Sequence, residues 1–438
     1  MKPSHLPLLL LIMLGLASRA PAQTVPQVAE PILSPAELRA DLQQLRTLLE
    51  KKHPEPYRYT SRERMDQWFD SLSSTLSAPM SARAFLARIT TLYPLLGDGH
   101  TMFLPADDDV QHRYLPIEVL LHDDSLLVRC DGPAAIGVRS GDRILAINGT
   151  EARDVVRALM QRQIRDGRNT TYPAWILDHW FRSYFRFAFG EPASFDIRLR
   201  TSDGDERSLR LPALPMDSIR LQWRTCVVEA SEAIELSFPD SGIAVLKIPS
   251  FEAATLAKVN GTAAHQLRAA FERIRARQVE HLVLDLRGNQ GGDPALAKLL
   301  LAHLLTEPFT LVAEGPSSGT TRPVALPYTG KLYTLMDGGC FSATGMVLAQ
   351  LELHGRGLLI GEEAGGDRTV LSGSARTNVL KHTRIACTVS RKTWRLVHRP
   401  DDGHGVLPTH PVNISAEDRI SGQDAPMNAA MRSIRCGH

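Results

Sequence analysis

A serine at a glycine-rich turn is the residue of this chain whose setting most clearly allows chemistry. Ser342 follows the segment Gly338-Gly339-Cys340-Phe341, with an apolar run at 332–336 before it and a helix-patterned stretch at 343–353 after it. A strand, a tight turn and a helix in this order expose the hydroxyl at a sheet edge, beside free backbone N–H groups. This setting suits a serine nucleophile, because attack on a carbonyl creates an oxyanion. A serine that only caps its helix has the same local pattern.

A second glycine turn could help to bind such an oxyanion. The segment 287–292, Arg-Gly-Asn-Gln-Gly-Gly, follows a buried-strand pattern at 281–286 and precedes Asp293 and Pro294, which predict a helix start. Backbone N–H groups from both turns could therefore point at one carbonyl oxygen. The turn lacks the spacings of the common phosphate-binding loops, so nucleotide binding is only weakly indicated.

The composition is that of a globular protein without a strongly charged partner. The chain has 438 residues, enough for two or three domains, with 43% hydrophobic and 22% charged residues. Its net charge of +2 gives no electrostatic argument for binding nucleic acid or an anionic membrane. The five cysteines form no C-x-x-C motif, so neither zinc nor a disulfide framework is indicated, and at least one cysteine stays unpaired.

The first residues have the pattern of an export signal. Lys2 is followed by an apolar core at 8–16 and by the small-residue motif Ala20-Pro21-Ala22. The core is too short for a membrane span, which needs ~20 apolar residues, and no later stretch is long and apolar enough. We therefore expect residues 1–22 to be a signal peptide and the mature protein to begin near Gln23. Its predicted location is the periplasm or the cell exterior.

Three further regions follow the signal segment. Residues 23–105 are predicted to be a helical domain, beginning with a capping box at Ser34 and leucines at helical spacing up to Leu49. Residues 110–213 have strand patterns, an Asn148-Gly149 turn and an aromatic, helix-like insertion at 162–189. Residues 214–438 alternate strands and helices. We therefore predict a multidomain α/β protein whose chemistry belongs to the last region.

Five separated motifs resemble those of one serine peptidase family. They are the segments 97–101, 285–292, 339–343, 361–366 and 405–408, and their order and content are similar to those of the C-terminal processing peptidases and the tricorn core. The segment 141–149 also resembles part of a PDZ domain. The resemblance implies a ClpP/crotonase-like α/β catalytic core, preceded by a helical domain and a PDZ-like domain.

The resemblance implies roles for the residues of both glycine turns. Ser342 matches the nucleophile, and the N–H of Ala343 matches one donor of the oxyanion hole. Gly291 or Gly292 supplies the second donor, with Gly292 favoured. One branch of the family uses a lysine base, but Glu363 occupies the matching position here and cannot act as a lysine.

The other branch of the family uses a histidine base, and this chain retains it as His100. The acid that orients this histidine lies three residues before Gly405, where the chain has Asp402 in place of the usual glutamate. Asp401 and His404 are close rivals for that role. The resulting hypothesis is a Ser342–His100–Asp402 triad, because histidine titrates near neutral pH and a carboxylate can fix its tautomer.

The implied function is that of an exported serine endopeptidase acting on proteins or peptides without a metal or organic cofactor. Its PDZ-like domain would capture a C-terminal tail by strand addition. Two alternatives remain: a ligand-binding protein whose catalytic site is vestigial, and another acyl-transfer enzyme on a crotonase-like core. The export signal and the PDZ-like segment speak against the last one.

Other conspicuous residues have simpler interpretations. Cys340 is expected to be a small buried thiol rather than a nucleophile. Arg287 could bind a substrate carboxylate or form a structural ion pair. The aromatic residues of the insertion are expected to belong to the core, although they could line a groove; they are Trp175, Trp180, Phe181, Tyr184, Phe185 and Phe187.

Overall fold

The computed structural model describes residues 31–105, 112–133, 136–223, 233–256, 262–315 and 318–436. The predicted signal peptide, residues 1–22, lies outside this described part, so its role stays a prediction. None of the helices in the described ranges is both long and apolar enough to cross a membrane.

The N-terminal helices begin where the sequence predicts side-chain caps. Helix α1 spans Pro35–Lys52, its capping box joins Ser34 and Glu37, and it ends at His53, as predicted. Leucines at helical spacing are buried along one face of α1. The following helices are α2 (Arg62–Thr75), α3 (Ala82–Ile89), the 3-10 turn η1 (Thr90–Leu92) and α4 (Tyr93–Leu96), and the short strands β1 (Ile32–Leu33) and β2 (Met80–Ser81) pair beside them.

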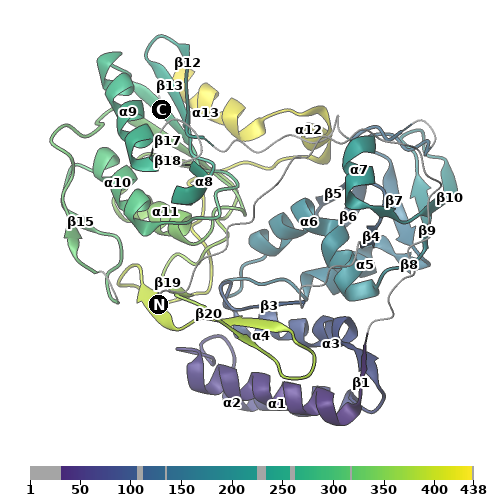
Figure 1. Cartoon of the computed structure of the whole chain (residues 1–438). Helices are drawn as coiled ribbons and strands as arrows, with labels where there is room; N and C mark the ends of the chain where they lie inside the picture. The colour runs from purple at the N-terminus through teal and green to yellow at the C-terminus, as the bar shows by residue number, and fades with distance from the viewer. Residues whose placement is uncertain are drawn as a thin grey trace, which may run out of the picture. The chain divides into compact units, whose positions relative to one another are not determined.

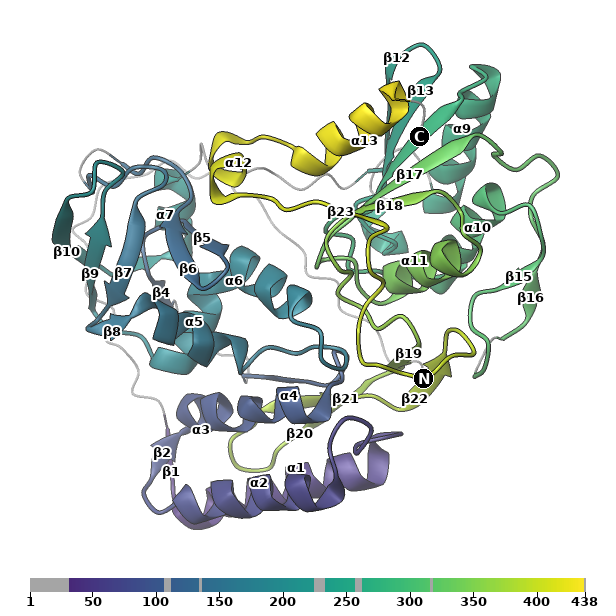
Figure 2. The same ribbon diagram turned by 180° about the vertical axis from the view of Figure 1, so that it is seen from behind.

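A hairpin from the C-terminal half completes the core of this helical region. Strands β20 (Arg376–Val379) and β21 (Ala386–Val389) pair with each other, and β21 also pairs with β3 (Met102–Leu104) (Figure 2). Hydrophobic residues of the hairpin, such as Leu380 and Ile385, are buried against the helices. The fully buried carboxylate of Asp41 accepts hydrogen bonds from the backbone N–H groups of His382 and Thr383. The core of the helical region is therefore shared with a hairpin from the C-terminal half.

The middle region is built on an antiparallel sheet. Its strand order is β10-β9-β7-β6-β5, with β8 added to β7. The predicted Asn148-Gly149 turn is present, with positive φ at both residues. Trp223, just past α7, is buried in the same core. The elements are β4 (Arg113–Tyr114), β5 (Val119–His122), β6 (Ser125–Val128), β7 (Arg143–Ile147), β8 (Thr150–Glu151), α5 (Ala152–Met160), α6 (Thr171–Phe189), β9 (Ser194–Arg200), β10 (Glu206–Pro212), β11 (Leu214–Pro215) and α7 (Met216–Gln222).

Helix α6 contains the aromatic residues of the predicted insertion. Phe181 and Phe185 are buried in the core, as expected. Trp180 is 42% exposed and lies at a kink of the helix, so the cluster is divided between core and surface.

The last region is an α/β sandwich, as predicted. Its sheet has the order β12-β13-β14-β17-β18-β23, with β12 antiparallel and the other strands parallel. Helices α9, α10 and α11 cover one face and α13 covers the other (Figure 1). The elements are β12 (Glu235–Asp240), β13 (Ile243–Lys247), α8 (Ala253–Leu256), α9 (Ala263–Ala276), β14 (His281–Asp285), α10 (Pro294–Leu304), β15 (Phe309–Thr310), β16 (Thr320–Thr321), β17 (Lys331–Met336), α11 (Ala343–Leu353), β18 (Leu358–Gly361), β19 (Val370–Gly373), β22 (Lys392–Arg395), β23 (His410–Pro411), α12 (Ala416–Ser421) and α13 (Ala425–Arg435).

The register of the parallel strands brings both glycine turns to one edge of the sheet. Strand β14 pairs with β17 up to Asp285 opposite Leu335, so the two strands end side by side. Each continues through its glycine turn into a helix, α10 or α11. Ligands of parallel sheets bind at these carboxyl ends, and this is where Ser342 lies.

Candidate active site

Ser342 has a strained backbone, and its hydroxyl does not cap the helix that follows. Its φ of 53° and ψ of −120° are rare for a residue with a side chain. Its side chain makes no capping hydrogen bond to α11, so the interpretation as a simple helix cap is wrong. Strain of this kind is typical of a serine held on a sharp turn between strand and helix.

His100 contacts Ser342 directly. The histidine follows α4 by way of Gly97, which is in the left-handed conformation (φ 61°). The two atoms His100 Nε2 and Ser342 Oγ are 3.0 Å apart, although the residues are 242 positions apart in the chain. With Nε2 unprotonated, the serine hydroxyl donates to it, which is the arrangement of a nucleophile with its base.

A stack of aromatic rings holds His100 in place. Its imidazole lies on Phe341, with ring centroids 4.8 Å apart, and Phe341 lies on Tyr172 of α6 at 4.2 Å. In both contacts the ring planes are stacked. The base is therefore positioned by the turn before Ser342 and by the middle region together.

Two backbone N–H groups remain available for an oxyanion. The N–H of Gly291 donates to the Asn289 side chain at 2.9 Å and is thus in use. Within the described ranges, the N–H groups of Gly292 and Ala343 have no hydrogen-bond acceptor. Of the two glycines considered from the sequence, Gly292 is the one whose donor is free.

The two glycine turns are in close contact. A Cβ atom on Gly291, whose φ is +94°, would lie 2.7 Å from the Ala343 nitrogen and 2.8 Å from Ser342 Cβ. Only glycine fits here, because any side chain would push the turns apart. This close approach places the free donors beside the serine.

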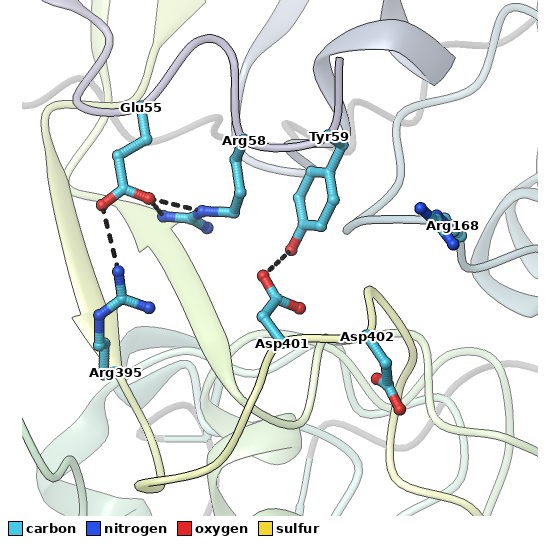
Figure 3. A pocket seen from close by; sticks show the side chains of 7 residues that line it. All are labelled: Glu55, Arg58, Tyr59, Arg168, Arg395, Asp401 and Asp402. Atoms are coloured by element: carbon cyan, nitrogen blue, oxygen red, sulfur yellow. Dashed lines mark hydrogen bonds and ion pairs between the residues drawn. The ribbon is translucent and has the colours of Figure 1, made fainter. Parts of the chain in front are cut away.

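Asp402 is not brought to His100. Its side chain is exposed and forms an ion pair with Arg368, and in Figure 3 it points away from Tyr59. Its rivals also lie elsewhere: Asp401 accepts a hydrogen bond from Tyr59 at 2.9 Å, and His404 contacts Glu363 at 3.2 Å. The triad with Asp402 is therefore incomplete in this structure, because the loop before Gly405 turns its acid toward an arginine.

Glu363, at the position of the lysine in the other branch, has a structural role. Its carboxylate accepts hydrogen bonds from the Gly405 N–H at 2.9 Å and from the Asn169 side chain at 3.1 Å. It therefore fixes the loop that carries Asp402.

A loop inside the predicted helical insertion contributes to the site. Residues 165–169 precede α6 and were not singled out from the sequence. The N–H of Gly167 donates to the Gly97 carbonyl at 2.9 Å, and the N–H of Arg168 donates to the Gly403 carbonyl at 2.7 Å. Asp166 accepts from the N–H of Gly99 at 2.8 Å. A glycine among charged residues in an otherwise aromatic stretch is the signal that could have predicted this loop.

Two buried carboxylates lie behind His100. Asp98 accepts hydrogen bonds from His53 Nε2 at 2.6 Å, from the Thr101 hydroxyl at 2.7 Å and from the His100 N–H at 2.9 Å. Burial alone would raise the pKa of Asp98, but the hydrogen bond and charge of His53 hold it well below its usual range. Asp98 is therefore ionised at neutral pH.

The second carboxylate, Asp166, behaves in the opposite way. Burial, and then the charge of Asp98, raise the pKa of Asp166 to about 7. Burial lowers the pKa of His100, with partial compensation by Asp98. Perturbed acid and base groups of this kind are typical of functional sites.

Among the described residues, one group could hold a metal ion by its geometry: Asp98, His100 and Asp166, whose ligand atoms lie within 4.8 Å of one another. The three hydrogen bonds to Asp98 argue against this use. A cation would have to displace them, so we treat the group as an acid–base cluster.

Cys340 and Arg287 have the simpler roles considered above. Cys340 is buried, its thiol contacts the Leu286 carbonyl at 3.1 Å, and burial raises its pKa. Arg287 forms ion pairs with Asp285 and Asp424, each at 2.7 Å. Cys130 is in a disulfide bond, and Cys340, Cys387 and Cys436 are free.

A third buried carboxylate, Asp367, adjoins the cluster. Its Oδ1 accepts hydrogen bonds from Thr369 and Val370, and its Oδ2 accepts one from Tyr59 at 3.0 Å. Tyr59 also contacts Asp401 and lines a pocket of about 270 Å³ (Figure 3). Burial, and then the charge of Asp401, raise the pKa of Asp367 above its ordinary value of 3.8.

The replacement Asp367→Asn should reduce the loss of stability with rising pH. Because the folded-state pKa of Asp367 is raised, its stabilising contribution is present below pH 3.8 and is lost as the pH rises through the folded-state value. An asparagine keeps the local acceptor and does not ionise. We expect the Tm of the wild type to fall more steeply than that of the variant between about pH 4 and about pH 7, the range that separates the unfolded-state and folded-state pKa values. Equal slopes, or a change of the same size in the exposed control Asp205→Asn, would contradict this.

Comparisons with known proteins find a family match in the α/β region and similar folds among solved structures. The model of Peptidase family S41 matches residues 242–412, which include both glycine turns. The fold is similar to that of mature CPAF in complex with lactacystin, with 14% identity, a TM-score of 0.69, and coverage of 92% of this chain and 98% of the other. A CPAF mutant gives 13% identity, a TM-score of 0.70 and the same coverages. Among curated proteins, no match by sequence is found. The α/β region of this chain, residues 242–412, matches the model of peptidase family S41, and the chain is a serine peptidase.

Proposed function

We propose that this protein is an exported endopeptidase that cleaves peptide bonds through an acyl-enzyme on Ser342. The observation that supports this most directly is the 3.0 Å contact between Ser342 Oγ and His100 Nε2. It lies beside free N–H groups of Ala343 and Gly292. Serine, base and oxyanion donors are the minimum set for acyl transfer.

The steps follow from this arrangement. His100 Nε2 takes the hydroxyl proton while Ser342 Oγ bonds to the carbonyl carbon, and the oxyanion accepts hydrogen bonds from Gly292 and Ala343. The C–N bond then breaks, and His100 returns the proton to the amine that leaves. A water molecule hydrolyses the acyl ester by the same steps.

The protonation state of His100 suits a base. Burial lowers its pKa, so the imidazole is neutral at and above neutral pH. Only the neutral ring can accept the serine proton. Phe341 covers one face of the ring and so limits its motion.

The replacement Ser342→Ala should abolish hydrolysis and leave the fold intact, because it removes only the attacking oxygen. We expect a fall in kcat of at least ~10³-fold on a peptide library. A fluorophosphonate probe should label the wild type at Ser342 and not the variant. The exposed Ser237→Ala should behave as wild type. A folded wild type that neither cleaves nor is labelled would favour the alternative of a vestigial binding protein.

Capture of C-terminal tails is a narrower proposal, supported by the family resemblance and by the outer edge of β5, which pairs with no further strand in the described part of the chain. That edge is covered by side chains. The N–H of Leu121 donates to Asp178 at 2.9 Å, and its carbonyl accepts from Arg419 at 2.6 Å. Arg129 donates to the Val119 carbonyl at 3.1 Å. A tail could add to β5 only by displacing these partners.

Peptides with a free or an amidated C-terminus test the tail proposal. If the terminal carboxylate is recognised, the free acid should have a KM at least ~10-fold lower than its amide, which corresponds to about 1.4 kcal/mol. The variant Arg419→Ala should strengthen this preference by opening the β5 edge. Equal KM values for acid and amide in both proteins would exclude tail capture.

Export is proposed from the N-terminal pattern alone. Expression of the whole chain in a bacterium should yield a periplasmic or secreted protein that begins near Gln23, because Ala20-Pro21-Ala22 is a cleavage motif. N-terminal sequencing of the purified protein gives the result. A cytoplasmic protein that retains residues 1–22 would refute it.

A further inference from the structure

One nitrogen of the base has no hydrogen-bond partner in the described part of the chain. His100 Nδ1 is buried from solvent and bonded to no protein group there. If Ser342 donates to Nε2, the ring proton must be on Nδ1. A buried N–H without an acceptor destabilises the folded protein, and the cost grows when the ring becomes positively charged. The base therefore needs an acceptor on this side.

Two carboxylates are close enough to supply it. A ring nitrogen of His100 and carboxylate oxygens of Asp98 and Asp166 lie within 4.8 Å of one another. Asp402 is exposed and is bound by Arg368 instead. The choice is therefore between the two buried acids.

The existing hydrogen bonds of the two acids show which of them can accept one more. Asp98 already accepts from His53, from the Thr101 hydroxyl and from the His100 N–H. Rotating it would break these bonds. Among the described residues, Asp166 accepts only from the N–H groups of Gly99 at 2.8 Å and Asp367 at 3.3 Å, and the second bond is long. Each of its oxygens keeps a lone pair, so Asp166 has the spare accepting capacity.

We propose that Asp166 is the positioning residue for His100 and that its carboxylate accepts the Nδ1–H as the imidazole takes the proton of Ser342. This rests on the proposed function and refines it, because it replaces Asp402 with an acid from the middle region. The proton moves from Ser342 Oγ to His100 Nε2. Asp166 takes up no proton in this step, and its negative charge stabilises the imidazolium.

Asp98 has a separate part in this arrangement. It remains ionised through its bond to His53 and raises the energy of a second charge on Asp166. The two acids thus differ in protonation near neutral pH, as paired catalytic carboxylates often do. The groups that face or influence Asp166 are Asp98, His100, Arg58, Asp367, Tyr59 and Tyr172.

The environment predicts a distinctive pH dependence. Because burial lowers the pKa of His100 and raises that of Asp166 to about 7, the histidine becomes neutral at a lower pH than that at which Asp166 ionises. Activity should therefore rise with the ionisation of Asp166, near pH 7. Without Asp166, it should rise at lower pH with the histidine alone.

Three variants of the full-length enzyme test the proposal through the pH profile of kcat. Asp166→Asn should lower kcat by at least ~10²-fold with little change in KM, and its acidic limb should move to lower pH. Asp166→Glu should regain part of the loss and keep the limb near that of wild type. Asp402→Asn should stay within about threefold of wild type with an unshifted limb. A large loss in Asp402→Asn together with a mild effect in Asp166→Asn would overturn the assignment.

A second readout does not depend on activity. In protein with labelled histidines, the Nδ1–H proton of His100 should resonate downfield in the wild type and move upfield in Asp166→Asn. Circular dichroism of the same samples checks that the variant is folded. An unchanged resonance in a folded variant would overturn the role of Asp166. Absence of Ser342-dependent hydrolysis together with the expected resonance shift would refute the proposed function but retain the contact.

Discussion

The candidate active site depends on one hydrogen bond between distant parts of the chain, that of His100 with Ser342. A single hydrogen bond contributes about 1 kcal/mol, too little to hold segments 242 positions apart in register. Three other contacts supply the rigidity. The ring stack fixes the imidazole, the loop at 165–169 bonds to Gly97 and Gly403, and the β20–β21 hairpin shares the core of the N-terminal helices.

The local parts of this arrangement could be predicted from the sequence. Strand β17, its glycine turn and α11 occur almost at the expected residues, and so do β14, the cap at Asp293 and α10. These features depend on near neighbours: an apolar run, glycines that allow unusual φ, and a capping side chain. His100 and Ser342 were found because the motifs that contain them are short and ordered. Their contact itself required the fold.

The parts that could not be predicted depend on tertiary contacts. Asp402 has the spacing expected of the orienting acid, but spacing does not determine where a loop turns its side chain, and Arg368 binds it. Asp166 lies in a stretch dominated by aromatic residues, where nothing local indicates that it packs against the Gly99 N–H. The shared core of hairpin and helices was missed for the same reason, since each segment has an apolar face that could have been covered by its neighbours.

The buried acids show how such a site balances stability against chemistry. An isolated charge is costly to bury, and this region holds Asp98, Asp166 and Asp367, each at most 4% exposed. Asp98 is offset by His53, whereas burial and then a neighbouring negative charge raise the pKa values of the other two. If Asp166 accepted as many hydrogen bonds as Asp98, its oxygens could not also accept the Nδ1–H of a protonated His100. A carboxylate that has few partners in the resting enzyme is stabilised most when the imidazolium forms beside it. The small number of partners of Asp166 therefore favours the protonated, positively charged His100 that acyl transfer requires.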